Sequence, residues 1–102
     1  MSQGLRKLIG KPELKEYLDY QVEKLAEHGY RITHSLNFDT HISVQVENRD
    51  FFFIRAMAHD GSREDAQAAG DECALDVLDA AWTHFKMPKR KVYRDTVKRE
   101  RA

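Results

Sequence analysis

The sequence predicts an α+β fold in which two helices pack on one face of a three-stranded antiparallel sheet, in the order α-β-β-β-α, followed by a basic C-terminal tail. Three observations carry this prediction. Apolar residues recur at helical spacing in two segments that flank the middle of the chain. Between these segments, three short runs have the apolar alternation or clustering of strands. The links between the runs are only a few residues long, which favours an antiparallel meander.

The first predicted helix runs from about Pro12 to His28. Pro12 suits the first helical turn, where its missing N–H would have no partner, and the acidic residues beside it complement the helix dipole. Gly29 favours a stop, because glycine readily adopts the left-handed conformation that ends helices. One face of the helix is predicted to be apolar and carries Leu14, Tyr17, Leu18, Val22, Leu25 and Ala26.

Three strands are predicted next, over residues 30–36, 40–47 and 51–58. Turn-forming residues separate them at Asn37–Asp39 and at Asn48–Asp50. The second strand alternates most cleanly, and the residues predicted to face inward are Ile42, Val44 and Val46.

The third strand breaks the alternation, because four consecutive apolar residues put hydrophobic area on both of its faces: Phe51, Phe52, Phe53 and Ile54. Two interpretations stay open. The strand is either central or otherwise well covered within the fold, or it forms a surface, including Phe51 and Phe53, for a second copy or another partner.

The second predicted helix begins at Ser62 and ends near Lys86, before Pro88. Ser62 with Asp65 three residues later approximates a capping box. The apolar stripe is rich in small residues and comprises Ala66, Ala69, Gly70, Cys73, Val77, Leu78, Ala81 and Phe85. Small side chains let this helix approach the sheet closely. The opposite face is acidic and carries Glu64, Asp71, Glu72, Asp76 and Asp79.

Charge is sorted along the chain, although the formal net charge is zero. Residues 13–85 carry 6 Lys/Arg against 15 Asp/Glu, a balance of −9, and the two ends compensate for it. We therefore expect a basic N-terminal extension over residues 1–11, the α-β-β-β-α domain over residues 12–87, and a basic extension over residues 88–102, for which a short helix is one option. An acidic body with basic extensions can address two different partner surfaces.

Several classes of protein find no support in the sequence. The single cysteine, Cys73, excludes an internal disulfide and lies on an apolar stripe, where we expect a small buried hydrophobe. The five histidines are spread over separate predicted elements without metal-ligand spacing. No apolar run approaches the length of a membrane span, and the first residues lack a signal region. We expect a cytoplasmic, non-enzymatic protein without a metal or cofactor.

The predicted element order over roughly residues 12–86 resembles the double-stranded-RNA-binding domain family. The clearest match is at the start of the second helix, where the family has a Ser, two Lys and closely spaced Ala residues. The corresponding stretch here reads Ser62-Arg63-Glu64-Asp65-Ala66-Gln67-Ala68-Ala69-Gly70. The turn at Ala58–Gly61 falls where the family has a Gly-containing turn.

This resemblance implies contacts with RNA from two residues of the domain. Arg63 corresponds to the lysines that contact phosphates across the major groove, and His41 to the histidine of the first inter-strand loop. Around them the sequence departs from the family, because Glu64 and Asp65 follow Arg63 directly and Asp39 precedes His41. Carboxylates at these positions repel phosphate, so we expect the main phosphate contacts elsewhere.

The leading functional hypothesis is a small non-enzymatic protein that associates with RNA or DNA through its C-terminal tail. The residues expected to make non-specific phosphate contacts are Lys86, Lys89, Arg90, Lys91, Arg94, Lys98 and Arg99. Tyr93 lies among them and either stacks on a base or packs back onto Trp82. Binding of this kind weakens steeply with salt and should be lost on truncation after Pro88.

A second hypothesis, from another class, is a protein-interaction adaptor or inhibitor of the kind small phage and accessory genes encode. Its acidic helix face would dock on a basic surface of a partner through Asp71, Glu72, Asp76 and Asp79, while the strand with Phe51 and Phe53 supplies a homodimer contact. Neutralising the acids should then abolish activity, whereas truncating the tail should not. A structural dimer without a binding role is a third option, and the sequence does not separate the three.

Overall fold

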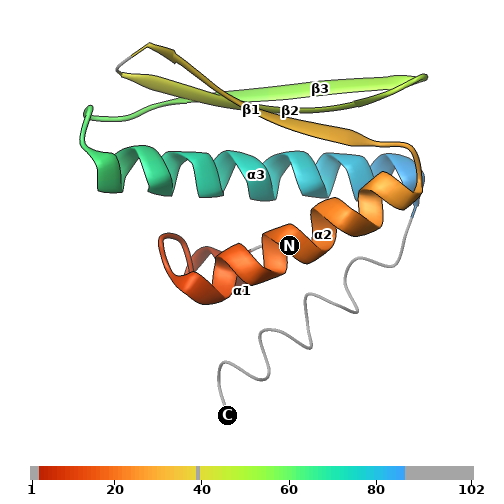
Figure 1. The fold of residues 1–102 in the computed structure, drawn as a ribbon, viewed down its shortest axis with the longest axis horizontal. Helices are drawn as coiled ribbons and strands as arrows, with labels where there is room; N and C mark the ends of the chain where they lie inside the picture. The colour runs from red at the N-terminus through yellow and green to blue at the C-terminus, as the bar shows by residue number, and fades with distance from the viewer. Residues whose placement is uncertain (1–2, 39, 87–102) are drawn as a thin grey trace.

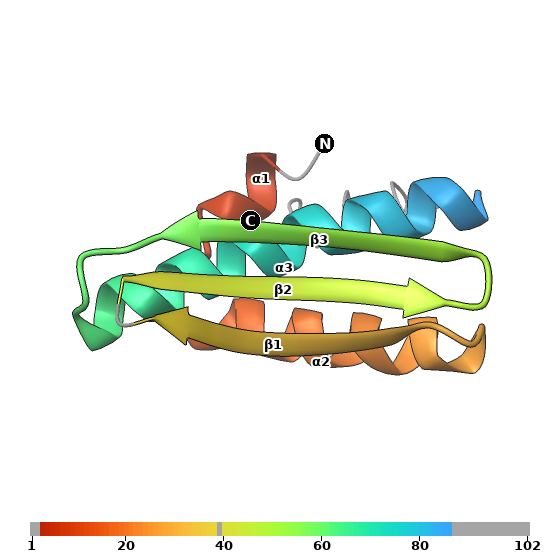
Figure 2. The same ribbon diagram turned by 90° about the horizontal axis from the view of Figure 1, so that it is seen from above.

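The computed structural model describes residues 3–38 and 40–86 of the 102-residue chain. Three strands form one antiparallel sheet in the order β1-β2-β3, and the helices lie on one side of it (Figures 1 and 2). The predicted α+β class and its α-β-β-β-α order are confirmed, with one short helix added before them. The elements are α1 (Gln3–Arg6), α2 (Pro12–Glu27), β1 (Arg31–Phe38), β2 (His41–Asn48), β3 (Phe51–Ala58) and α3 (Arg63–Phe85).

Helix α2 has the bounds and the stop that its sequence predicts. Pro12 occupies its first turn, and Gly29 follows its end with a φ of 85°, a backbone conformation that glycine adopts without strain. The apolar face differs in two places. Ala26 is exposed, whereas Gln21 is buried, because its side chain accepts a hydrogen bond from the indole of Trp82 on α3.

The central strand, β2, has the predicted orientation, with Val44 and Val46 fully buried toward the helices. The first hairpin turn is shorter than predicted. Phe38 still belongs to β1 and lies opposite His41, after a register shift between Ser35 and Phe38. Because of this irregularity, Asn37 and Phe38, which the sequence predicts to lie in the turn, belong to the strand instead.

Strand β3 has the predicted bounds, but its interpretation as a central or well-covered strand is wrong. It lies at an edge of the sheet. Phe51 and Phe53 face the helices and are partly buried, whereas Phe52 and Ile54 face the other way and are 58% and 48% exposed. The reason is architectural: the described helices all cover the same face, so the aromatic area on the opposite face has no cover among the described residues (Figure 1).

Helix α3 crosses β2 and β3 and supplies most of the core. Gly70 permits the close approach, since a Cβ added there would lie 3.1 Å from Cδ1 of Ile42. Toward its C-terminal end the buried arc turns toward α2. Trp82, which the predicted stripe does not include, is therefore part of the core, whereas Phe85, predicted on the stripe, is exposed.

The start of α3 is capped by Ser62, whose hydroxyl oxygen accepts a hydrogen bond from the Asp65 N–H at 3.1 Å. The reciprocal bond differs from a standard capping box. The Asp65 carboxylate accepts from the N–H of Asp60 at 2.7 Å, and the Ser62 N–H is bound by the Asp60 carboxylate instead. The helix ends at Phe85, and Lys86 adopts the left-handed conformation with a φ of 63°, close to the predicted stop.

The segment before α2 is packed into the domain. Leu5 and Leu8 are almost fully buried and form a second small core with Leu14 of α2 and Leu75 of α3. Figure 2 shows α2 beneath β1 and α1 on the opposite side of α3, near β3. The positively charged N-terminal segment thus contributes apolar anchors, which the charge pattern had concealed. None of the described helices combines the length and apolarity that a membrane crossing requires.

Candidate interaction surfaces

Three of the residues predicted to contact nucleic acid belong to the described part of the chain, and they lie at opposite ends of α3. Arg63 is its first residue, and His41 lies near the same end because it pairs with Ala58 at the end of β3. Lys86 follows the last residue of this 23-residue helix, which corresponds to a separation of roughly 34 Å. The other predicted contacts lie outside the described residues: Lys89, Arg90, Lys91, Tyr93, Arg94, Lys98 and Arg99.

The start of α3 is a negatively charged environment. Hydrogen bonds from the Ser62 hydroxyl and from the Ser62 backbone N–H lower the pKa of the Asp60 carboxyl below its ordinary value, so this group is ionised at neutral pH. Glu64 and Asp65 lie in the first turn of the helix beside Arg63. Three carboxylates around one guanidinium repel phosphate, so the charges around Arg63 are unfavourable for a phosphate contact.

The acidic face of α3 is interrupted at Asp71, which we had placed on the exposed side. Asp71 is only 8% exposed. One carboxylate oxygen accepts the backbone N–H of Gly10 at 2.8 Å, and the other accepts the side-chain amide of Gln67 at 2.9 Å. Asp71 is buried because the N-terminal segment covers this part of the helix.

Further along the same face, an ion-pair network joins three elements. Arg6 of α1 lies 3.1 Å from the Glu72 carboxylate and 2.5 Å from one oxygen of Asp76. The second oxygen of Asp76 lies 3.2 Å from Nε of Arg55 on β3. Asp79 is half-buried one turn later. Two of the carboxylates predicted to meet a basic partner are therefore already paired with cations of the same chain.

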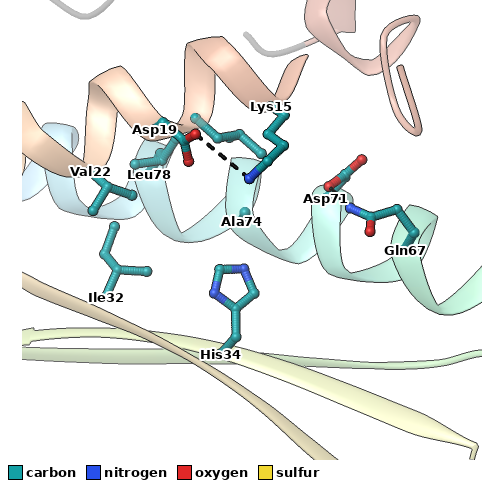
Figure 3. A pocket seen from close by; sticks show the side chains of 10 residues that line it. Lys15, Asp19, Val22, Ile32, His34, Gln67, Asp71, Ala74 and Leu78 are labelled. Atoms are coloured by element: carbon teal, nitrogen blue, oxygen red, sulfur yellow. Dashed lines mark hydrogen bonds and ion pairs between the residues drawn. The ribbon is translucent and has the colours of Figure 1, made fainter. Parts of the chain in front are cut away.

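A small cavity that the sequence did not reveal lies between α2, α3 and β1, with a volume of about 180 Å³ (Figure 3). Lys15 and Asp19 of α2 form an ion pair of 3.7 Å at this cavity, and His34 enters it from β1. The register offers the only signal for it, since His34 lies opposite the inward-facing Val44. The lining includes no serine, threonine, cysteine or tyrosine that could act as a nucleophile.

Cys73 is fully buried among the core residues, as the sequence predicted. Burial raises the pKa of its thiol, and the Asp76 carboxylate acts in the same direction, while the Arg55 guanidinium opposes this in part. Thiolate is the reactive form, so the raised pKa suppresses the reactivity of Cys73. Among the described residues no group of three or more His, Cys, Asp or Glu side chains is placed to hold a metal ion.

We expect Cys73 to be protected from alkylation in the native protein. At mildly alkaline pH, iodoacetamide should modify it on the order of 1,000-fold more slowly than in urea-unfolded chain, because modification requires an opening that costs a large part of the folding free energy. Mass spectrometry of timed samples measures both rates. Native labelling at the unfolded rate would show that this side of α3 is open.

Comparisons with models of protein families, with curated proteins and with solved structures find no match to this chain.

Proposed function

We propose that this chain is a small non-enzymatic nucleic-acid-associated protein whose phosphate contacts come mainly from the basic residues after α3. One observation carries the proposal: residues 86–102 hold 8 Lys/Arg against 2 Asp/Glu. A dense cluster of cations supplies the sequence-independent part of nucleic-acid affinity, because each neutralised phosphate releases counterions.

The charge balance of the body supports placing these contacts outside it. The described residues before Lys86 carry 9 Lys/Arg against 14 Asp/Glu. Several of their cations are engaged within the fold: Arg6 with Glu72 and Asp76, and Arg31 with Glu47 at 2.8 Å. The resemblance to a duplex-RNA reader therefore extends to the order of elements, while the helices lack the clustered cations that such a reader needs.

The adaptor hypothesis draws less support from the same surface. Asp71 is buried and hydrogen-bonded, and Asp76 holds two guanidinium groups. A basic partner would have to displace Arg6 and Arg55 before it could reach Asp76. Such a competition lowers the gain from a new ion pair.

The test is a binding measurement on variants of the full chain. Glutamine at Lys89, Arg90, Lys91 and Arg94 together should weaken binding to short fluorescent duplex RNA, duplex DNA and single strands. Four lost charge-assisted contacts of about 1 kcal/mol each correspond to a loss of roughly 1,000-fold in affinity. Fluorescence anisotropy at about 50 mM salt, where such contacts are strong, gives the dissociation constants.

The matched control removes the same number of charges from the body. Lys7, Lys11, Lys15 and Lys24 are changed to glutamine, and affinity should stay within about 3-fold, because carboxylates outnumber cations in the body and Lys15 and Lys24 already pair with Asp19 and Glu27. An equal loss in both variants would indicate a general charge effect. Unchanged binding of the tail variant would overturn the proposal, and a chain ending at Pro88 should behave as that variant does.

A further inference from the structure

The outer edge of β3 lacks the features that commonly prevent an exposed strand from pairing with another strand. β3 pairs with β2 at all eight positions without a bulge, and within the described chain it has no second neighbour. Its sequence contains no proline or lysine, the residues that commonly blunt exposed edges. The other edge strand, β1, carries the register shift between Ser35 and Phe38. Figure 1 shows the helices below the sheet, and Figure 2 shows β3 at its margin.

The face of β3 that points away from the helices is an uncharged row. It consists of Phe52, Ile54, Ala56 and Ala58, all of them exposed. The one charged side chain on the strand is Arg55, which lies on the helix side and pairs with Asp76. An exposed apolar row on a regular edge strand favours the addition of another strand.

The hairpin determines which backbone groups of β3 face the open edge. Asn48 lies opposite Phe51 across the two-residue turn at Arg49 and Asp50. The pair that closes such a turn is a hydrogen-bonded pair, and hydrogen-bonded pairs alternate along an antiparallel ladder. The N–H and C=O groups of Phe52, Ile54 and Ala56 therefore point away from β2, toward the open edge.

We propose that β3 pairs antiparallel with β3 of a second copy, about a two-fold axis at Ile54, to form a continuous six-stranded sheet. A two-fold axis perpendicular to the sheet keeps the helices of both copies on the same side of the joined sheet. Residues that lie opposite each other across the joint therefore have their side chains on the same face. Two registers then give the largest overlap. One is centred on Ile54 and spans residues 51–57, and the other is centred on Arg55 and spans residues 52–58.

Charge selects between the two registers. Centring on Arg55 places its guanidinium directly opposite the same group of the second copy, and like charges in that position are destabilising. Centring on Ile54 places Arg55 opposite Phe53 of the second copy. Arg55 already lies over the Phe53 ring of its own chain, 5.8 Å from its centroid, and a second ring provides another favourable cation–π contact.

The Ile54 register also matches side chains by size. Phe52 lies opposite Ala56 of the second copy, so a large side chain meets a small one, and Ile54 meets its counterpart. Symmetry repeats the pairing of Phe52 with Ala56 on both sides of the axis.

Sedimentation velocity on the full chain tests for the dimer. Between about 1 µM and about 100 µM the sedimentation coefficient should rise from the monomer value toward the dimer value, as mass action requires. Ile54→Lys should weaken the dimer by about 100-fold or more, because two ammonium groups would meet at the axis. Thr33→Lys, on the same face of the other edge strand, should leave the dimer unchanged. A chain that stays monomeric over this whole concentration range would overturn the proposal. The edge of β3 would then be available to a strand of a different protein.

Cysteine substitution tests the register. In a hydrogen-bonded antiparallel pair the two Cα atoms lie about 5.5 Å apart, which suits a disulfide. With oxidised glutathione as the oxidant, Ile54→Cys should give a covalent dimer on non-reducing gels, whereas Ala56→Cys, which lies opposite Phe52, should not. Equal cross-linking of both variants, or cross-linking of Ala56→Cys alone, would contradict the two-fold axis at Ile54.

Discussion

Replacing Trp82 with alanine is expected to lower the free energy of unfolding by about 3–5 kcal/mol. The indole is 4% exposed and lies in the main core between α3, α2 and the sheet. Its N–H donates to the buried side chain of Gln21 at 2.7 Å. Removing the ring leaves a cavity and deprives the Gln21 side chain of its hydrogen-bond donor. Both effects add to the loss of unfolding free energy. Urea unfolding followed by circular dichroism measures the change.

Two further variants separate the hydrogen bond from the packing. Gln21→Leu leaves the indole N–H buried without an acceptor and should cost about 1–3 kcal/mol. Combined with Trp82→Phe, which removes the donor, the double variant should be more stable than the sum of the single effects implies. A cost below about 1 kcal/mol for Trp82→Ala would be incompatible with the placement of Trp82 in the core.

The second large effect is expected at the N-terminal segment. Leu5 is 1% exposed and contacts the small core formed with Leu8, Leu14 and Leu75. Leu5→Ala should therefore lower the free energy of unfolding by about 2–4 kcal/mol. Lys7→Ala, at an exposed position of the same segment, should change it by no more than about 0.5 kcal/mol. Equal effects of the two substitutions would mean that residues 1–11 form an extension outside the domain, as the charge pattern alone suggested.

Local sequence signals were sufficient for the main elements of the fold. The predicted starts of α2 and α3, and both ends of β3, agree with the structure. Each of these elements has such a signal: Pro12 and Gly29 flank α2, Ser62 caps α3, and turn-forming residues stand on both sides of β3. Such signals depend on neighbours in the sequence, so they can be recognised without knowledge of the tertiary packing.

The features that the sequence did not reveal all depend on contacts between distant residues. Arg6 and Asp76 are 70 positions apart, and Asp71 is buried because the Gly10 N–H binds it from 61 positions away. Trp82 enters the core through a partner on another helix, Gln21. Leu5, Leu8 and Ile9 have helical spacing, but three apolar residues in a short charged segment are too few to predict that Leu5 docks into the domain.

The candidate interaction surfaces also differ in how far the sequence alone reveals them. Charge sorting is a property of the order of residues along the chain, so it indicated the basic tail without any structure. The acidic face of α3 also looked like a docking surface in the sequence. The sequence alone does not distinguish a carboxylate that is paired within the fold from one that faces solvent. The structure supplied the difference through the pairing of Asp76 with Arg6 and Arg55.

The salt dependence of binding tests the central proposal most directly. For the full chain, the logarithm of the association constant with duplex nucleic acid should fall steeply and linearly with the logarithm of the salt concentration. The variant with glutamine at Lys89, Arg90, Lys91 and Arg94 should have a slope shallower by about 3 to 4, since each phosphate contact contributes about 0.9. The body variant with glutamine at Lys7, Lys11, Lys15 and Lys24 should keep the slope of the full chain. A tail variant that retains that slope, with the body variant losing it, would contradict the proposal.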